Sequence, residues 1–382
     1  MRIGIDARWI GWELSGIGAY TQELIRYVAL ENSAHEFYVY FHDARVQERT
    51  WAHCDLAAHP QFSAVMVPDG PFSLITQWRM PRLIRAHALD VFHATNFMLP
   101  FRAFPRHRRG PTACVVTIYD LIPLLFPEYT PRAWKTRLHP VFRRVMREVG
   151  QRADLIITIS SASQQDITEH MLRGIRKAPA MVTIPAGVDT RFTPAPPVEH
   201  GEKVILYVGR MDPYKNVTGL INAFVKMRTR VPFPVRLRLI GPRNPQYTEV
   251  EDLIARHRLA PHIDWPGYVS DEELVQAYQQ ADIFVLPSLY EGFGMPVIEA
   301  MASGTPVICS NRASLPEVAG DAARLIDPLD TAQLADAICA ILSDPAQAAT
   351  MREKGLQQAA EFSWTQTARQ TLAAYEQAAQ LE

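Results

Sequence analysis

The sequence lacks the features that would place it among secreted, membrane-spanning or zinc-binding proteins. Its 382 residues include four cysteines, and none of them forms a C-x-x-C pair: Cys54, Cys114, Cys309 and Cys339. Isolated cysteines exclude a disulfide framework and indicate buried thiols in a reducing compartment. No apolar run reaches about 18 residues, and the opening MRIGIDARWIG lacks the basic-then-apolar pattern of a signal peptide. We therefore expect a cytoplasmic protein.

An excess of charge of one sign is also missing. The chain has 39 Lys and Arg against 40 Asp and Glu, a net charge of −1, which argues against nucleic acid as a partner. The balance conceals two unlike halves, because residues 1–195 carry 23 basic and 17 acidic side chains and residues 196–382 carry 16 and 23. The sign changes at the proline-rich stretch Thr193–Pro197, which has the composition of a linker.

The length suits two domains better than one core. We predict an N-terminal domain over residues 1–195 and a C-terminal domain over residues 196–363, and we expect a last helix, 364–382, to pack back on the first domain.

Short apolar runs alternate with amphipathic stretches in both halves. The runs predicted as strands are Ile3–Ile5, Phe37–Phe41, Val91–His93, Cys114–Ile118, Leu155–Ile159, Met181–Ile184, Val204–Val208, Val235–Ile240, Ile283–Leu286 and Pro306–Cys309. The stretches predicted as helices are Tyr20–Leu30, Trp134–Val149, Val217–Met227, Glu272–Gln280, Val297–Ser303, Leu334–Leu342 and Thr365–Gln380. Buried strands alternating with helices indicate parallel sheets. We expect an α/β fold of two Rossmann-like, doubly wound domains that face each other across a cleft, where such sheets bind ligands.

Two glycine-containing turns sit between a predicted strand and a predicted helix. The first is Ser15–Gly18, and the second is Gly209-Arg210 followed by Lys215. Such turns expose backbone amides to an anion at a helix N-terminus, and two cations five residues apart can bracket a diphosphate. The plainer interpretation of the first is an ordinary turn between a strand and a helix, where glycine is common. That of the second is two solvated surface cations flanking a turn. A dinucleotide fingerprint is disfavoured, because Thr21 stands where its third glycine would be.

The segment Pro287–Val307 carries the strongest pattern in the chain. A predicted strand runs into Gly292-Phe293-Gly294, and Pro296 stands in the first turn of the helix that follows. Glu299 lies in an otherwise apolar part of that helix, eight residues after Glu291. A carboxylate in such a place needs hydrogen-bond donors, which a ligand with hydroxyl groups supplies. A helix-capping role is the alternative for either glutamate taken alone.

Together these motifs resemble the retaining glycosyltransferases of family 4, which have the two-domain GT-B fold. The resemblance covers nearly the whole chain. It rests on Gly209-Arg210-x4-Lys215 and on Glu291-x7-Glu299 within EGFGMPVIEAMASGTPVI. The segments IDAR…SGIGAY and Asp120–Arg132 are similar to the bacterial branch that transfers mannose or rhamnose to polysaccharides.

The resemblance implies that the N-terminal domain binds an acceptor and the C-terminal domain a nucleotide sugar. It also implies a role for each matching residue. Arg210 and Lys215 would grip the diphosphate of the donor, Glu291 would contact the transferred sugar, and Glu299 would hold the ribose. The remaining donor-site positions are Gly16, which would close over the diphosphate from the other domain, Gly209 and Gly292 in the turns, the backbone amides of Phe293, Gly294 and Met295, and Tyr268 and Val269 against the nucleobase.

One position departs from the pattern. Relatives often carry histidine before the aspartate of the DLIPL segment, whereas this chain has Tyr119 before Asp120. A phenol donates a hydrogen bond but does not carry charge near neutral pH as imidazole does. We expect Tyr119 and Asp120 to lie next to the transferring sugar.

The implied reaction moves a hexose from a nucleoside diphosphate sugar to a hydroxyl of a saccharide or lipid-linked saccharide, with retention of configuration. GDP-mannose is the donor that the likeness to mannosyltransferases suggests. The chain has no Asp-x-Asp motif and no histidines paired with carboxylates at ligand spacing, so we expect no metal and no cofactor. A nucleotide-sugar epimerase, a dinucleotide oxidoreductase and a noncatalytic sugar-nucleotide binding protein are the alternatives.

Basic residues gather in the first half of the chain. They are Arg102, Arg106, Arg108, Arg109, Arg132, Lys135, Arg137, Arg143, Arg144, Arg147 and Arg152. A solvated helix face is the ordinary interpretation of the later set. The sharper hypothesis is peripheral contact with an anionic membrane or with a pyrophosphate-linked lipid acceptor at the inner face of the membrane.

Overall fold

A computed structural model describes residues 1–31, 34–127, 135–196 and 201–381, with the side chains of residues 135–138 excepted. The chain divides into two compact units. Among the described residues, unit 1 comprises 1–127, 135–187 and 363–381, and unit 2 comprises 188–196 and 201–362. Within the described residues, no helix is both long and apolar enough to cross a bilayer.

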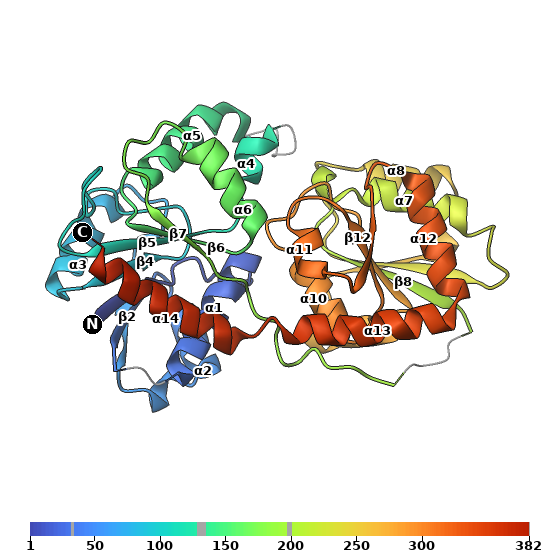
Figure 1. Ribbon diagram of the computed structural model, residues 1–382, viewed down its shortest axis with the longest axis horizontal. Coiled ribbons are helices and arrows are strands. Elements are labelled where there is room, and N and C mark those ends of the chain that lie inside the picture. The colour runs from blue at the N-terminus through green and yellow to red at the C-terminus, as the bar shows by residue number, and fades with distance from the viewer. Residues whose placement is uncertain (32–33, 128–134, 197–200, 382) are drawn as a thin grey trace. The chain divides into compact units, whose positions relative to one another are not determined.

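Unit 1 contains one parallel sheet with helices on its two faces (Figure 1). Its strands are β1 (Arg2–Asp6), β2 (Glu36–Phe41), β3 (Phe62–Met66), β4 (Val91–Ala94), β5 (Ala113–Ile118), β6 (Leu155–Thr158) and β7 (Ala180–Thr183). Its helices are α1 (Gly16–Leu30), α2 (Ala44–His53), α3 (Thr76–Ala86), α4 (Ile122–Leu125), α5 (Lys135–Gly150), α6 (Ser161–Asp166), the π-helical turn η3 (Ile167–Met171) and α14 (Trp364–Gln380).

Unit 2 has the same construction. Its strands are β8 (Lys203–Val208), β9 (Val235–Ile240), β10 (Ile263–Gly267), β11 (Ile283–Leu286), β12 (Val307–Ser310) and β13 (Ala323–Ile326). Its helices are α7 (Val217–Met227), α8 (Glu249–Arg256), α9 (Asp271–Gln280), α10 (Met295–Ala302), α11 (Leu315–Ala319), α12 (Thr331–Ser343) and α13 (Pro345–Ala360). Helix α7 packs on α12 and α10 packs on α13 (Figure 1).

Both sheets are doubly wound. The strand order is β3-β2-β1-β4-β5-β6-β7 in unit 1 and β10-β9-β8-β11-β12-β13 in unit 2, and every pair is parallel. In unit 1 the order reverses between β1 and β4, where Ile3 pairs with Phe37 on one side and with Val91 on the other. Sheets of this kind bind ligands at the carboxyl ends of their strands beside such a reversal.

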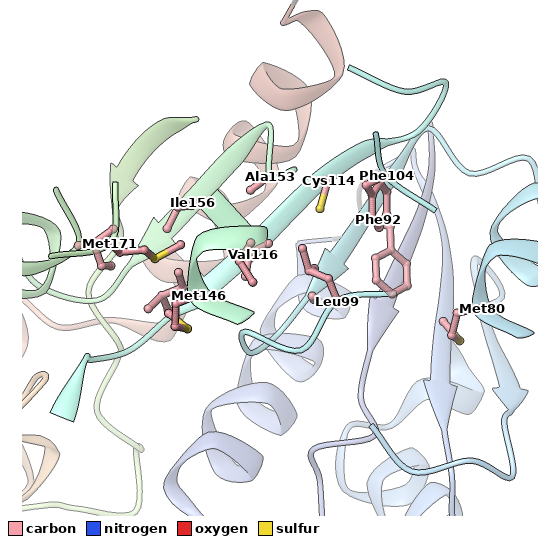
Figure 2. Packing of buried hydrophobic residues seen from close by; sticks show 14 of the residues in the cluster. Met80, Phe92, Leu99, Phe104, Cys114, Val116, Met146, Ala153, Ile156 and Met171 are labelled. Carbon is pink, nitrogen blue, oxygen red and sulfur yellow. The ribbon is translucent and has the colours of Figure 1, made fainter. Parts of the chain in front are cut away.

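The core of unit 1 forms because its central strands are apolar on both faces. Residues of β4, β5 and β6 meet side chains of α3, α5 and η3 in one buried cluster, and Figure 2 labels Met80, Phe92, Leu99, Phe104, Cys114, Val116, Met146, Ala153, Ile156 and Met171. Polar caps fix where helices begin. The Ser15 hydroxyl accepts from the Gly18 amide at 3.2 Å, and Ser270 and Glu273 form a capping box at α9.

The C-terminal helix α14 belongs to unit 1. Trp364 packs against Tyr20, with ring centroids 5.3 Å apart, and the hydroxyl of Tyr375 lies 2.7 Å from Nδ1 of His93 on β4. His93 is fully buried, and burial lowers its pKa to about 3, so this imidazole is neutral. Helix α14 therefore completes one face of the first sheet beside α1 (Figure 1).

The division between the units lies at 187/188 and again at 362/363, earlier than the boundary at 195/196 that the proline-rich stretch suggested. The cause is that residues 188–196 bind unit 2. The amide of Val188 donates to Phe362 O at 2.9 Å, and Arg352 donates to Ala195 O at 2.6 Å. Pro197 itself lies outside the described residues, as do Arg132 and Trp134.

Candidate functional site

The carboxyl edge of the second sheet is built around closely approaching glycines. Gly209 and Gly241 follow β8 and β9 with φ of 154° and 144°, and the Gly209 amide donates to Ile240 O at 2.9 Å. A Cβ on Gly241 would lie 1.9 Å from the carbonyl oxygen of Gly209. Only glycine fits there. The chain can therefore turn sharply after β8 and present Arg210 at the edge of the sheet.

Arg210 is anchored at its base and open at its tip. The hydroxyl of Tyr207 donates to the Arg210 carbonyl at 2.7 Å, and Nε of Arg210 lies 2.8 Å from Oδ2 of buried Asp212. Asn244 donates to the other carboxylate oxygen of Asp212 at 3.1 Å. The side chain of Arg210 is nevertheless 65% exposed. Its guanidinium is thus oriented and still accessible to an anion.

Lys215 and Glu291 meet directly. A single 3-10 turn, η4 (Pro213–Lys215), carries the lysine, and its Nζ lies 2.8 Å from both carboxylate oxygens of Glu291. The Ser288 hydroxyl donates to Oε1 of Glu291 at 2.6 Å. A backbone hydrogen bond of 2.7 Å from Leu289 N to Tyr214 O joins the two loops. The two residues are 76 positions apart in the sequence, and the tertiary structure brings their charged groups together.

The glycine-rich turn before α10 is fixed by Ser314. Its buried hydroxyl lies 2.8 Å from the carbonyl oxygens of Glu291 and of Phe293. Gly294 has φ of 107°, and a Cβ there would lie 2.6 Å from Leu315 Cδ2. Helix α10 begins at Met295 without an acidic residue in its first turn. Glu291 precedes this positive helix end by four residues, and the end favours an anion because no acidic side chain offsets it.

Glu299 lies four residues after the start of α10 and is partly buried. The hydroxyl of Tyr278 donates to its Oε2 at 2.9 Å. Burial raises the pKa of Glu299 to about 7, while Tyr278 and the positive charge of Arg191 act in the opposite direction. Arg191 also forms an ion pair with Asp271 and lies 3.4 Å from Asp189. This carboxyl group is therefore poised between its acidic and ionised forms near neutral pH.

The position of Glu299 predicts a pH-dependent stability. The pKa of Glu299 is about 7 in the folded protein, against an ordinary value of 4.5, so folding favours the protonated carboxyl group. The stability that this group contributes is therefore complete below pH 4.5 and is lost as the pH rises toward 7. Glu299→Gln should therefore raise the melting temperature above pH 7 and leave it unchanged below pH 4.5. Glu353→Gln, on the exposed face of α13, is the control. A melting temperature that Glu299→Gln lowers equally at every pH would contradict the assignment.

The next strand end carries exposed aromatic and basic groups. Tyr268, directly after β10, is 79% exposed, and Val269 is partly exposed. Trp265 on β10 donates through Nε1 to Gly241 O at 2.9 Å, and the guanidinium of Arg243 lies 4.5 Å from the centre of its ring. The edge thus offers a flat surface beside a further cation.

The sequence-predicted residues of unit 1 lie at the carboxyl edge of its own sheet. Gly16 is exposed at the start of α1, with open space around it. The hydroxyl of Tyr119 donates to Thr95 O at 3.0 Å, its ring packs edge-on to Tyr20, and burial raises its pKa well above the ordinary value. Oδ1 of Asp120 accepts from the amide of Ile122 at 3.0 Å.

The structure therefore brings Arg210, Lys215, Glu291 and Glu299 to one edge of unit 2, and Gly16, Tyr119 and Asp120 to one edge of unit 1. Sequence reasoning missed the partners that hold the charged groups: Asp212, Ser288, Tyr278, Arg191, Arg243 and Ser314. Asp212 and Ser288 lie inside the quoted motifs, so a search for partners two or three residues away would have found them. Over the part of the chain that the structure describes, no three metal-ligating side chains lie together.

Two family models cover most of the chain. Residues 14–192 match Glycosyltransferase Family 4, and residues 189–358 match Glycosyl transferases group 1. The O-antigen chain mannosyltransferase B of Escherichia coli is 31% identical, over 98% of this chain and 99% of that protein. The MMP alpha-(1->4)-mannosyltransferase of Mycolicibacterium hassiacum is 34% identical, over 62% of this chain and 57% of that one.

Solved structures share the fold at low sequence identity. Sucrose-phosphate synthase from Thermosynechococcus elongatus superposes with a TM-score of 0.75 at 21% identity over 98% of both chains. Anabaena HepE in complex with UDP-glucose gives a TM-score of 0.74 at 18% identity, over 99% of this chain and 100% of that one. The expected class, two parallel-sheet α/β units of the GT-B type, is confirmed.

Proposed function

The chain belongs to the glycosyltransferases of group 1 and family 4, and from this we propose that it transfers mannose from GDP-mannose to a hydroxyl of a glycan or lipid-linked saccharide, with retention and without a metal ion. The mannosyltransferase names of two relatives support the choice of sugar. The observation that carries the proposal is the charge arrangement in unit 2. An accessible guanidinium, an ammonium paired with a carboxylate and a helix N-terminus meet at one strand edge.

This arrangement suits the departure of a diphosphate. As the bond between the anomeric carbon and the diphosphate oxygen breaks, negative charge develops on the leaving group. Arg210, Lys215 and the amides at the start of α10 stabilise it by fixed electrostatics, which is the part that a divalent ion takes in other enzymes. The acceptor oxygen bonds to the anomeric carbon on the same face and gives its proton to a diphosphate oxygen. Glu291 holds the sugar and Lys215 and is not a nucleophile in this scheme.

The other proposed donor contacts follow from the same edge. Glu299 accepts hydrogen bonds from the ribose hydroxyls, and Tyr268 and Val269 lie against the base. The turn residues Gly209, Gly292, Phe293, Gly294 and Met295 bring backbone amides to the diphosphate. Unit 1 binds the acceptor through the edge that carries Tyr119 and Asp120, and Gly16 contributes its amide to the diphosphate.

Thermal shift with nucleoside diphosphates tests the donor site. GDP should raise the melting temperature more than UDP, ADP or CDP at the same concentration, because the nucleotide with the lowest Kd stabilises the folded protein most. A ligand at a hundred times its Kd adds about 2.7 kcal/mol of stability. Glu299→Ala should remove most of the GDP-induced shift, and Glu353→Ala should keep it. Equal shifts from all four nucleotides, or an unchanged shift in Glu299→Ala, would count against this site.

Product analysis separates transfer from the alternatives. With GDP-mannose and a mannose-terminated acceptor, NMR should show an α-linked product, and activity should persist after EDTA treatment. An epimerase would change the donor sugar without an acceptor, and a binding protein would leave both substrates unchanged. An inverted product, or loss of turnover in EDTA that Mg²⁺ restores, would overturn the corresponding part of the proposal.

A further inference from the structure

Large apolar side chains are exposed at the carboxyl edge of the first sheet. Two segments supply them, the loop after β1 and the stretch from residue 70 into the start of α3. Leu74 is 78% exposed and Phe72 66%. The set, which we call the apolar rim, is Trp12, Leu14, Phe72, Leu74, Ile75 and Trp78. An exposed cluster of this size is unusual for a surface that faces only water and indicates an interaction site.

The two segments of the apolar rim form one ordered surface. The ring of Trp9 packs between Phe72, at 5.3 Å between centroids, and Phe97, at 6.0 Å. Beneath them the buried guanidinium of Arg8 donates to Asp69 O at 3.2 Å and to Oγ1 of Thr76 at 3.0 Å. Phe72 is therefore packed from below, and the segment that carries Leu74 and Ile75 is fixed by hydrogen bonds on both sides of it.

Arginines border the rim at several points, and one exposed acidic residue, Glu13, lies within it between Trp12 and Leu14. The guanidinium of Arg49 lies 5.5 Å from the centre of the Trp12 ring, and that of Arg102 lies 4.8 Å from the centre of the Trp78 ring. Arg82 and Arg85 are exposed on α3 one and two turns after Trp78. Residues 70–86 contain no acidic side chain. The rim thus combines apolar groups with positive charge along α3.

We propose that the apolar rim docks on an anionic lipid bilayer, with Leu74, Ile75 and Phe72 entering its interfacial layer. Tryptophan suits the level of the headgroups, and arginine stems lie along apolar surface while their charged ends reach phosphates. Each positive side chain near an anionic surface adds to the attraction. The proposal rests on the proposed function in one respect: if the acceptor is linked to a lipid, docking would bring it to the sheet edge that carries Tyr119 and Asp120.

Two other occupants fit the rim less well. A glycan would stack on aromatic faces, but arginines already cover one face of Trp12 and of Trp78, and Leu74 and Ile75 offer no ring. A second copy would bring the same positively charged surface against itself in a two-fold contact. The basic side chains of α5, Arg143 and Arg147, would add long-range attraction to the membrane, whereas the rim supplies the apolar contact.

Flotation of the full chain with vesicles tests the proposal. The protein should float with phosphatidylglycerol–phosphatidylcholine vesicles at low salt and much less with phosphatidylcholine alone. The triple variant Phe72→Ser/Leu74→Ser/Ile75→Ser should weaken flotation at least about tenfold at all salt concentrations. Arg82→Gln/Arg85→Gln should weaken it at low salt. Leu329→Ser, an equally exposed apolar side chain of unit 2, should bind as the wild type does.

Failure of membrane docking and failure of the proposed function would give different results. The triple variant should keep wild-type transfer to a soluble acceptor and lose transfer to an acceptor embedded in vesicles. Absence of flotation of the wild type, equal flotation of the triple variant, or self-association that the triple variant abolishes would overturn the docking surface. Loss of transfer to the soluble acceptor would instead assign the rim to the glycan. Flotation without any transferase activity would leave docking intact and remove the proposed function.

Discussion

Replacing Arg210 with alanine should lower kcat by about a hundredfold or more while leaving the melting temperature unchanged. The guanidinium is aimed by Asp212, and 65% of the Arg210 side chain is exposed. Buried Asp212 keeps the hydrogen bond from Asn244 when the guanidinium is removed, so the loss of folding energy should be smaller than for Lys215→Ala. In the proposed reaction its positive charge stabilises the departing diphosphate. Because that charge develops in the transition state, kcat should fall more than KM rises.

Lys215→Ala should produce a loss of kcat of similar size, together with a loss of stability. Lys215 neutralises Glu291, which is almost fully buried, so the variant leaves a carboxylate without its partner. Lys215→Met combined with Glu291→Gln should restore stability and leave activity lost. Lys203→Ala is the matched control, since that lysine pairs with Asp282 at 2.8 Å at the opposite end of β8. Wild-type rates in Arg210→Ala and Lys215→Ala would refute the charge assignment.

The sequence predicts the interior of the fold better than its margins. Strands β4, β5, β6, β11 and β12 are buried along their whole length, and continuous apolar runs reveal them. Strands β3, β10 and β13 lie at sheet edges and alternate irregularly between exposed and covered positions. These edge strands are defined by pairing with a neighbouring strand, and the local pattern of apolar residues does not predict that pairing.

The same contrast holds for the site. Gly209, Arg210, Lys215 and the Glu291–Glu299 segment are close in sequence to glycine turns, so their position at a strand end could be inferred. The contact of Lys215 with Glu291 and that of Tyr278 with Glu299 join separate elements, and no spacing rule predicts them. The hydroxyl of Tyr119 is a further contact that the sequence does not predict, because it donates to Thr95 O, directly after a different strand, β4.

Arg8→Met should destabilise unit 1 by about 3–5 kcal/mol, the usual cost of leaving a buried charge unpaired. Arg8 and Asp6 form a two-pronged ion pair with both contacts at 2.7 Å, and neither side chain is exposed. Burial lowers the pKa of the guanidinium, but Asp6 outweighs it and the pKa is raised. Urea unfolding followed by tryptophan fluorescence measures the loss, because unit 2 contains Trp265 alone among the tryptophans.

Two further variants decide whether the buried charge is the cause. Arg8→Met with Asp6→Asn should recover a large part of the lost stability, since no charge is then left unpaired. Arg2→Met removes the exposed ion pair between Arg2 on β1 and Glu36 on the neighbouring β2, and it should cost less than about 1 kcal/mol. Because unit 2 has its own core, Arg8→Met should still bind GDP at low temperature, whereas Arg210→Ala should unfold normally and fail in turnover. If Arg8→Met unfolded at the wild-type urea concentration, the buried pair would not be what anchors the segment that carries Leu74 and Ile75.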